Sequence, residues 1–216
     1  MLEKKQYVLT VEGETEQWYF LWLRDQINKV ETRKFNMAIT IKVQQSPRSY
    51  YKGVIAKSVP EIIHICDIES ADAYDIKKFE DILKQMKEAK KHKNIKYELG
   101  YNNFTFELWM ILHKRDCFRL FDDRQQYLVP IQQCFKEKFD NLECYKQEAA
   151  FKRCLDKLTL EDVKAAIKRA DTLMQNNVRN GKKLTKYSGY SYYRENPSLS
   201  IHEVVKRMLS ECGVMS

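Results

Sequence analysis

Glycine and proline are scarce in this chain of 216 residues, which has 6 glycines and 4 prolines. So few residues of these two kinds exclude collagen-like and low-complexity architectures and most long linkers. Hydrophobic residues make up 44% of the chain and aromatic residues 12%, which is too rich for a disordered protein. The length corresponds to one domain, or to one domain with a substantial appendage, and it can bury a core without a disulfide or metal staple.

Paired cysteines and long apolar runs are also absent. The 6 cysteines include no C-x-x-C pair and do not resemble a disulfide framework, so we interpret them as ordinary thiols in a reducing cytosol. Residues 1–11 carry charges where a signal peptide needs an apolar core. The longest apolar stretch, Phe106 to Leu112, contains Glu107 and is too short to span a bilayer. We therefore expect a soluble, cytoplasmic protein that does not enter a membrane.

Acidic residues are fewer than basic ones. The chain has 38 Lys and Arg and 30 Asp and Glu, which give a formal net charge of +8. This balance favours a polyanionic partner, either nucleic acid or an acidic membrane surface. The sequence has no G-x-x-x-x-G-K-[ST] loop, so any ATPase activity would come from a partner protein. No spacing of Cys and His residues indicates a zinc site.

The first half of the sequence alternates between strand and helix patterns. Strands are predicted at 7–11, 37–43, 61–66 and 95–99, and helices at 17–30 and 75–93. Thr15 is the candidate N-cap of the first helix. This order of elements favours a mostly parallel α/β sheet. Residues 47–59 show no clear period and must make the crossover between the second and third strands.

From Phe104 onwards the helical period dominates. Helices are predicted at 106–113, 123–139, 147–155, 160–175 and 200–211. Between the last two of these helices, residues 178–194 read as a basic loop with interleaved tyrosines. We therefore divide the chain into an α/β domain, residues 1–116, and a helical extension, residues 117–216, which carries the basic loop.

Acidic residues directly follow two of the predicted strands. Glu12 follows the first strand, and Asp67 and Glu69 follow the third. In a 2-1-3 strand order the carboxyl ends of these strands are neighbours, so the three carboxylates would meet and raise each other's pKa unless a cation joined them. Oxygen ligands favour Mg²⁺ or Mn²⁺ as this cation. A bound Mg²⁺ or Mn²⁺ in turn implies a phosphate-bearing substrate. The alternative is that these acids are ordinary helix caps.

Four motifs carry a family resemblance. Residues 11–16 (VEGETE), before an aromatic helix, resemble the first motif of TOPRIM domains, and residues 67–69 (DIE) resemble the second, which is usually Asp-x-Asp. Residues 103–113 (NFTFELWMILH) resemble the N-P-x-F-E-L-W-L-L-L-H segment of the RloB family. Residues 196–202 (NPSLSIH) resemble its closing N-P-S-x-x-x-H. The four motifs occur in the family's order and cover nearly the whole chain.

The resemblance implies a TOPRIM-like, mostly parallel Rossmann-type sheet flanked by helices, with a helical C-terminal half. It also implies a divalent-metal-dependent nuclease of prokaryotic anti-phage or abortive-infection systems. Glu12 matches the TOPRIM glutamate, which is expected to act in acid/base chemistry or metal binding, and Asp67 matches the first metal-ligand aspartate. Glu69 stands where the pattern has Asp, and Phe104 stands where it has Pro.

Three further residues are catalytic candidates. Glu16 and Glu107 match acids of the family, and Glu107 would lie beside the crevice if its helix packs across the fourth strand. His113 ends the same apolar helix, where it could contact a phosphate or favour the helix C-terminus as a cation. The alternative for His113 is an ordinary packing role.

Basic and aromatic residues that suit phosphate contacts and base stacking occur in two segments. The candidates in residues 178–194 are Arg179, Lys182, Lys183, Lys186, Tyr190 and Arg194. Arg48 and Lys52 form a weaker second patch next to two tyrosines. The alternative is a solvated surface loop, which would also be basic in a basic protein.

The sequence therefore predicts a Mg²⁺- or Mn²⁺-dependent endonuclease or RNase that acts on DNA or RNA, with tRNA among the candidates. Glu12, Asp67 and Glu69 are its predicted metal ligands. The partners that we expect are nucleic acid and an ATPase or other defence-system protein. The sequence leaves open whether the protein forms a homodimer. The alternative function is a catalytically inactive nucleic-acid-binding or regulatory module of a defence system, which the Glu at position 69 keeps open.

Overall fold

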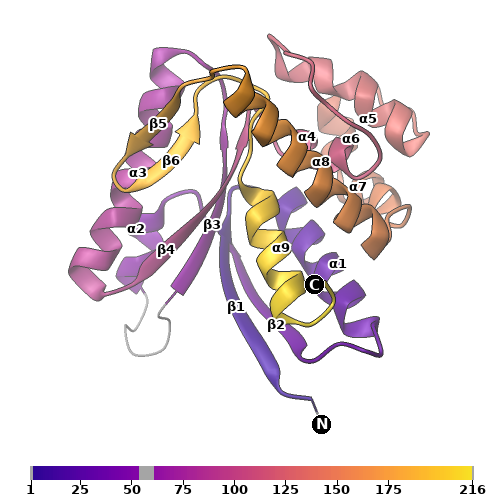
Figure 1. Cartoon of the computed structure of the whole chain (residues 1–216), viewed down its shortest axis with the longest axis horizontal. Helices are drawn as coiled ribbons and strands as arrows, with labels where there is room; N and C mark the ends of the chain where they lie inside the picture. The colour runs from indigo at the N-terminus through magenta and orange to yellow at the C-terminus, as the bar shows by residue number, and fades with distance from the viewer. Residues whose placement is uncertain (1, 54–60, 216) are drawn as a thin grey trace.

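The computed structural model describes residues 2–53 and 61–215, and a parallel sheet forms its centre (Figure 1). Its strands are β1 (Lys4–Val11), β2 (Asn36–Val43), β3 (Glu61–Ile68) and β4 (Lys96–Asn103). They lie in the order β2-β1-β3-β4, and each neighbouring pair is parallel. The predicted 2-1-3 order is confirmed, so the carboxyl ends of β1 and β3 are neighbours.

The helices of the first half are α1 (Glu14–Lys29), α2 (Pro47–Gly53) and α3 (Ala73–Lys93). The short helix α2 forms in the crossover where the sequence shows no period, and the rest of that crossover lies outside the described residues. The prediction of Thr15 as the N-cap of the first helix is wrong. Gly13 is the N-cap, and Thr15 lies inside the first turn, where its hydroxyl donates to Glu16.

The second half is mainly helical, as predicted. Its helices are α4 (Glu107–Leu112), α5 (Leu128–Phe135), α6 (Leu142–Lys146), α7 (Glu148–Leu155), α8 (Leu160–Arg179) and α9 (Ile201–Glu211), with a 3₁₀ helix, η1, at Arg124–Tyr127. The single helix predicted over 123–139 is wrong. Pro130 lacks a backbone N–H and has to lie in a first helical turn, so the α-helix starts only at Leu128. No helix among the described residues is long and apolar enough to cross a bilayer.

The loop predicted at 178–194 contains an antiparallel hairpin of β5 (Leu184–Tyr187) and β6 (Tyr190–Tyr193). Ser188 and Gly189 both have positive φ, 52° and 94°, which suits a two-residue hairpin turn. Tyr192 is fully buried, and its ring packs against those of Phe79 and Tyr101. The loop prediction is therefore wrong, because the Ser-Gly pair between Thr- and Tyr-rich runs is a hairpin signal.

Two apolar layers enclose the sheet (Figure 1). Helices α2 and α3 and the hairpin cover one face, and α1 and α9 cover the other, with α4–α8 beyond them. The second half of the chain thus contributes to both layers, because Tyr192 belongs to the first and α9 to the second. The division of the chain at 116/117 stays a prediction.

Side chains of β3 and α9 pack closely against β4 at Gly100. A Cβ atom at Gly100 would lie 2.5 Å from Ile65 Cδ1 and 3.3 Å from Val204 Cγ2. We expect Gly100→Ala to destabilise the fold by about 1–3 kcal/mol through overpacking, and to lower Tm by about 2–4 °C per kcal/mol. Gly53→Ala is the matched control, because nothing lies within 4 Å of its added Cβ. Thermal unfolding measures both variants, and equal Tm values for the two would contradict this packing.

Candidate functional site

An acidic cleft of about 360 Å³ lies at the carboxyl ends of the strands. Residues from the β1–α1 junction, the end of β3, η1 and the α6–α7 junction line it. Its acidic lining residues are Glu12, Glu14, Glu16, Asp67, Glu69 and Glu143, and its basic ones are Arg124 and Lys146. Carboxylates thus outnumber cations in the cleft, so a bound cation would be favoured there.

Glu12 and Asp67 meet in this cleft, as the strand order predicts. Glu12 follows β1 directly, and its Oε2 atom accepts a hydrogen bond from the Asp67 backbone N–H at 3.0 Å. Both carboxylate oxygens of Asp67 accept bonds from uncharged donors: Oδ1 from Asn102 Nδ2 at 3.2 Å and Oδ2 from the Phe106 backbone N–H at 3.1 Å. These donors orient the Asp67 carboxylate but leave its charge without a counterion.

Burial raises the pKa of both carboxyls. It raises the pKa of Glu12 to about 7, with a smaller contribution from Glu16. The pKa of Asp67 is raised well above its usual range, again mainly by burial and then by Glu16 and Glu12. The Asp67 residue keeps some contact with solvent, but the surrounding atoms enclose its carboxyl group. Loss of hydration therefore contributes more than the crowding of like charges that the sequence suggests.

Glu69 lines the same cleft but is paired with cations. Its Oε1 atom accepts from Lys78 Nζ at 2.9 Å, and its Oε2 atom accepts from Arg124 at 3.2 Å. The hydrogen bond from Lys78 lowers the pKa of Glu69, so the expectation that crowding raises the pKa of all three carboxylates is wrong for this residue. Its role as a metal ligand stays a prediction.

Glu16 and Glu107 lie deeper than Glu12. Glu16, in the first turn of α1, accepts a hydrogen bond from Thr15 at 2.9 Å, and burial raises its pKa, with a contribution from Glu107. Glu107 begins α4, the element that directly follows β4, and its side chain is fully buried and does not line the cleft. Glu12, Glu16, Asp67 and Glu107 are called the carboxylate cluster below.

Lys146 is a residue of this site that the sequence does not reveal. It ends α6, a five-residue helix that periodicity does not predict, and it lines the cleft. Its Nζ atom lies 3.6 Å from Glu107 Oε1. No motif surrounds Lys146, and only the fold brings α6 to the carboxyl ends of the strands.

The chemistry of these residues fits a hard divalent cation. Within residues 2–53 and 61–215, no three His, Cys, Asp or Glu side chains are arranged to hold a metal ion. However, Glu12 and Asp67 are joined carboxylates that offer only oxygen donors, and Asp67 has no counterion among its hydrogen-bond partners. Oxygen donors and uncompensated negative charge are what Mg²⁺ and Mn²⁺ prefer. These two residues are the candidate ligands.

A family model described as RloB-like protein matches residues 7–208. The chain belongs to the RloB-like family. All four sequence motifs lie inside the matched range, and the resemblance to the RloB family is confirmed. No curated protein and no solved structure matches the chain.

The two most specific motifs of this RloB-like protein bind each other. Asn103 Nδ2 donates to the Tyr193 carbonyl at 2.9 Å and to Ser198 Oγ at 3.2 Å. Asn196 donates to and accepts from the backbone of Phe121 at 2.9 and 3.2 Å. These contacts fix the end of β4 and the turn into α4, which hold Asp67. Phe104, in that turn, has φ 73°, which the family's usual proline could not adopt.

The structure does not bring His113 to the acidic cleft. The residue is 1% exposed, with Nε2 3.1 Å from the Tyr19 hydroxyl and Nδ1 2.9 Å from the Trp109 carbonyl. Burial lowers its pKa to about 4, so it is neutral at physiological pH. The prediction that His113 contacts phosphate or acts as a cation is wrong, because Tyr19 on α1 covers the end of α4.

Several predicted nucleic-acid contacts have partners inside the protein. Arg48 binds Glu88 through two nitrogens at 3.1 and 2.7 Å, and Arg194 binds Glu80 at 2.9 Å. Lys182 donates to the Asn196 carbonyl at 2.9 Å, and the Tyr190 hydroxyl donates to the Tyr97 carbonyl at 3.2 Å. These four side chains therefore already have partners within the protein, and their role as nucleic-acid contacts stays a prediction.

Four other candidates have exposed side chains with no hydrogen bond or ion pair to the part of the chain that the structure describes. They are Lys52, Arg179, Lys183 and Lys186. Arg179 ends α8, Lys183 directly precedes β5, and Lys186 lies within β5. Three of the four residues are therefore in or next to the hairpin. Among the predicted contacts, this group of cations is the most accessible to a phosphate backbone.

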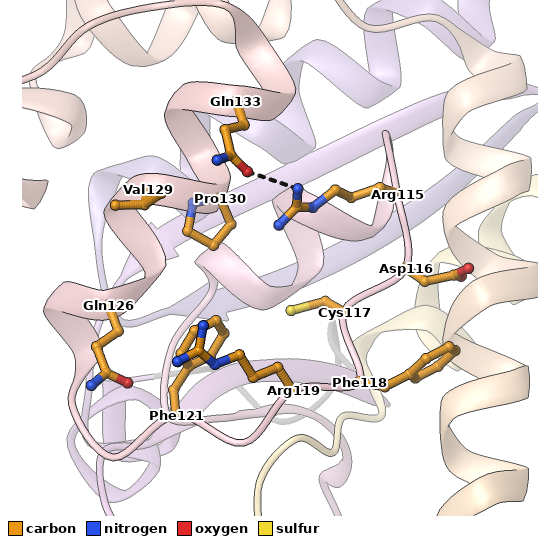
Figure 2. A pocket seen from close by; sticks show the side chains of 10 residues that line it. All are labelled: Arg115, Asp116, Cys117, Phe118, Arg119, Phe121, Gln126, Val129, Pro130 and Gln133. Atoms are coloured by element: carbon orange, nitrogen blue, oxygen red, sulfur yellow. Dashed lines mark hydrogen bonds between the residues drawn. The ribbon is translucent and has the colours of Figure 1, made fainter.

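A second cleft of about 390 Å³ lies beside α5 (Figure 2). Its lining is largely apolar, with Phe118 and Val129 exposed, and Arg115 donates to Gln133 at 2.8 Å. The Arg119 guanidinium lies over the Phe121 ring, 5.5 Å from its centroid. The cleft contains none of the predicted site residues, so the acidic cleft is the candidate site.

The raised pKa of Glu12 predicts a stability that falls as pH rises. The folded protein holds this proton to about pH 7, whereas the unfolded chain releases it near the ordinary value of 4.5. Folding therefore binds a proton at Glu12. The contribution of this proton to the free energy of unfolding is fully present below about pH 4.5 and is lost as pH rises to about 7. In EDTA, we expect Tm to fall between about pH 4.5 and 7, and Glu12→Gln to reduce that fall by several degrees.

Glu14→Gln is the control for this measurement. Glu14 is exposed and begins α1 two residues after Glu12, so its replacement should leave the pH dependence of Tm as in the wild type. If wild type and Glu12→Gln show the same dependence, Glu12 does not hold a proton in the fold.

Proposed function

We propose that this RloB-like protein is a divalent-metal-dependent nuclease that hydrolyses phosphodiester bonds in nucleic acid. The observation that carries the proposal is the enclosed pair of carboxylates, Glu12 and Asp67, at the carboxyl ends of two adjacent parallel strands. A hydrogen bond joins the two residues, and burial raises both of their pKa values. Carboxylates outnumber cations in this cleft, and ligands of α/β sheets bind at this edge.

Glu12 and Asp67 would hold the ion, Mg²⁺ or Mn²⁺. When bound, the ion would lower the pKa of a coordinated water and neutralise charge on the leaving oxygen. Asn102 and the Phe106 backbone N–H keep the Asp67 carboxylate in one orientation. This fixed orientation reduces the reorganisation that the reaction requires.

Lys78 and Arg124 are the residues that would receive the phosphate. Both donate to Glu69, so Glu69 holds two cations beside the cleft. A phosphate group that enters the cleft competes with Glu69 for these donors. In this proposal Glu69 positions cations, which explains why a Glu serves at a position where the TOPRIM pattern has Asp.

The substrate that we propose is a polymer, DNA or RNA, with tRNA included. The net charge of +8 and the exposed cations Arg179, Lys183 and Lys186 favour a long phosphate backbone over a small phosphate ester. From the family resemblance we further propose a role in cytoplasmic anti-phage defence, together with an ATPase or other defence-system protein.

A binding or regulatory module without catalysis is the second candidate. The pairing of Glu69 with Lys78 and Arg124 favours it, since this carboxylate is not free for a metal. Such a module would bind nucleic acid with strong salt dependence, without an effect of Mg²⁺ and without cleavage. A metal titration with labelled tRNA and with single- and double-stranded DNA distinguishes the two candidates.

Replacement of Asp67 tests the nuclease. We expect Asp67→Ala to lose several kcal/mol of transition-state stabilisation, which is about a thousandfold in cleavage rate. Nucleic-acid affinity in EDTA and the folded state should stay close to those of the wild type. Gel cleavage assays in Mn²⁺ or Mg²⁺, with circular dichroism and filter binding alongside, measure the three properties.

Asp140→Ala is the matched control, because Asp140 is exposed and does not line the cleft. Its cleavage rate should equal that of the wild type. Metal-stimulated cleavage by Asp67→Ala at the wild-type rate would refute the assignment.

The cations around the hairpin predict a change in salt dependence. Each phosphate contact contributes about 0.9 to the slope of log K against log salt for duplex DNA, or about 0.7 for single strands. The double variant Lys183→Gln, Lys186→Gln should therefore weaken binding and reduce the slope by about 1–2. Arg48→Gln should leave the slope unchanged, because Glu88 already binds this side chain. Equal slopes for the double variant and the wild type would exclude the hairpin from the interface.

A further inference from the structure

Glu107 has an unusual environment for a carboxylate. Its side chain is fully buried, and Oε2 accepts a hydrogen bond from the Thr105 hydroxyl. Its other oxygen, Oε1, has no hydrogen-bond partner among the described residues. A buried carboxylate oxygen in this state requires a positive charge nearby, and Lys146 Nζ lies 3.6 Å away.

Packing around α6 fixes the position of Lys146. Its chain neighbour Tyr145 is fully buried, with ring centroids 5.5 Å from Phe139 and 5.6 Å from Phe151. Asn141 caps the N-terminus of α6 through the Cys144 backbone N–H at 2.8 Å. The Lys146 side chain is 25% exposed, so the ammonium group extends from a packed helix into the cleft.

The ammonium group acts on the whole inner part of the carboxylate cluster. Lys146 lines the same cleft as Glu16 and Asp67, in addition to its contact with Glu107. These three carboxylates are the ones that a second divalent ion would use. A dication next to a fixed ammonium would meet like-charge repulsion in an enclosed site, where screening by water is weak.

We propose that the Lys146 ammonium is the built-in cation of the inner carboxylate cluster and takes the place of a second divalent ion. The site therefore binds one divalent ion, at Glu12 and Asp67. This inference rests on the proposed function, since it concerns the number of ions that the nuclease site holds.

The test is the number of Mn²⁺ ions bound by the full-length protein. Isothermal titration calorimetry and electron paramagnetic resonance count the bound ions. Ions that the wild type binds and Asp67→Asn does not are assigned to the cleft. We expect one ion in the wild type and two in Lys146→Met, in which the inner carboxylates have lost their cation. Lys146→Arg should keep one ion because it keeps the charge.

Two further variants separate charge from folding. In the double variant Lys146→Met, Glu107→Gln, both partners of the pair are neutral, and we expect one ion again. Lys152→Met, in the neighbouring helix α7, is the control, because Lys152 is exposed and its one ion pair among the described residues is with Glu148. It should bind one ion like the wild type.

The outcomes distinguish this inference from the proposed function. A wild type that binds two ions in the cleft overturns the inference but leaves the metal-dependent nuclease standing, and this result needs no folded variant. A folded Lys146→Met with one ion also overturns the inference. A wild type that binds no Mn²⁺ overturns the proposed function and this inference with it.

Discussion

The hydrogen bond from the Asp67 backbone to the Glu12 carboxylate joins the carboxyl ends of β1 and β3. Parallel pairing of these strands brings the two acids together, and burial keeps their pKa values high. An enclosed pair of this kind is costly without a cation, because charged groups lose hydration in a protein interior. Much of the remaining geometry of the cleft either supports this pair or supplies positive charge around it.

Positive charge reaches the cleft from two directions. On the outer side, Lys78 and Arg124 converge on Glu69. On the inner side, Lys146 faces Glu107. The cleft thus has cations on both its outer and its inner side.

The sequence motifs of the RloB-like family divide between chemistry and structure. The acids after β1 and β3 lie in the cleft, as their positions at strand ends predict. Asn103 and Asn196, in the two most specific motifs, instead bind backbone groups that hold the hairpin and the turn into α4. His113, at the end of one motif, is a buried packing residue. A motif that identifies a family therefore does not by itself identify reactive groups.

The sequence by itself determined the parallel sheet, its strand order and the meeting of Glu12 with Asp67. Apolar strand patterns and acids at strand ends are local features, and the parallel pairing rules convert them into neighbours. Only the tertiary structure decided that Glu69 pairs with cations, that His113 is buried and that Lys146 enters the cleft. These outcomes depend on contacts between segments far apart in the chain, such as Lys146 with Glu107 and Arg124 with Glu69. The charge and burial of a side chain are set by such neighbours, which no local pattern encodes.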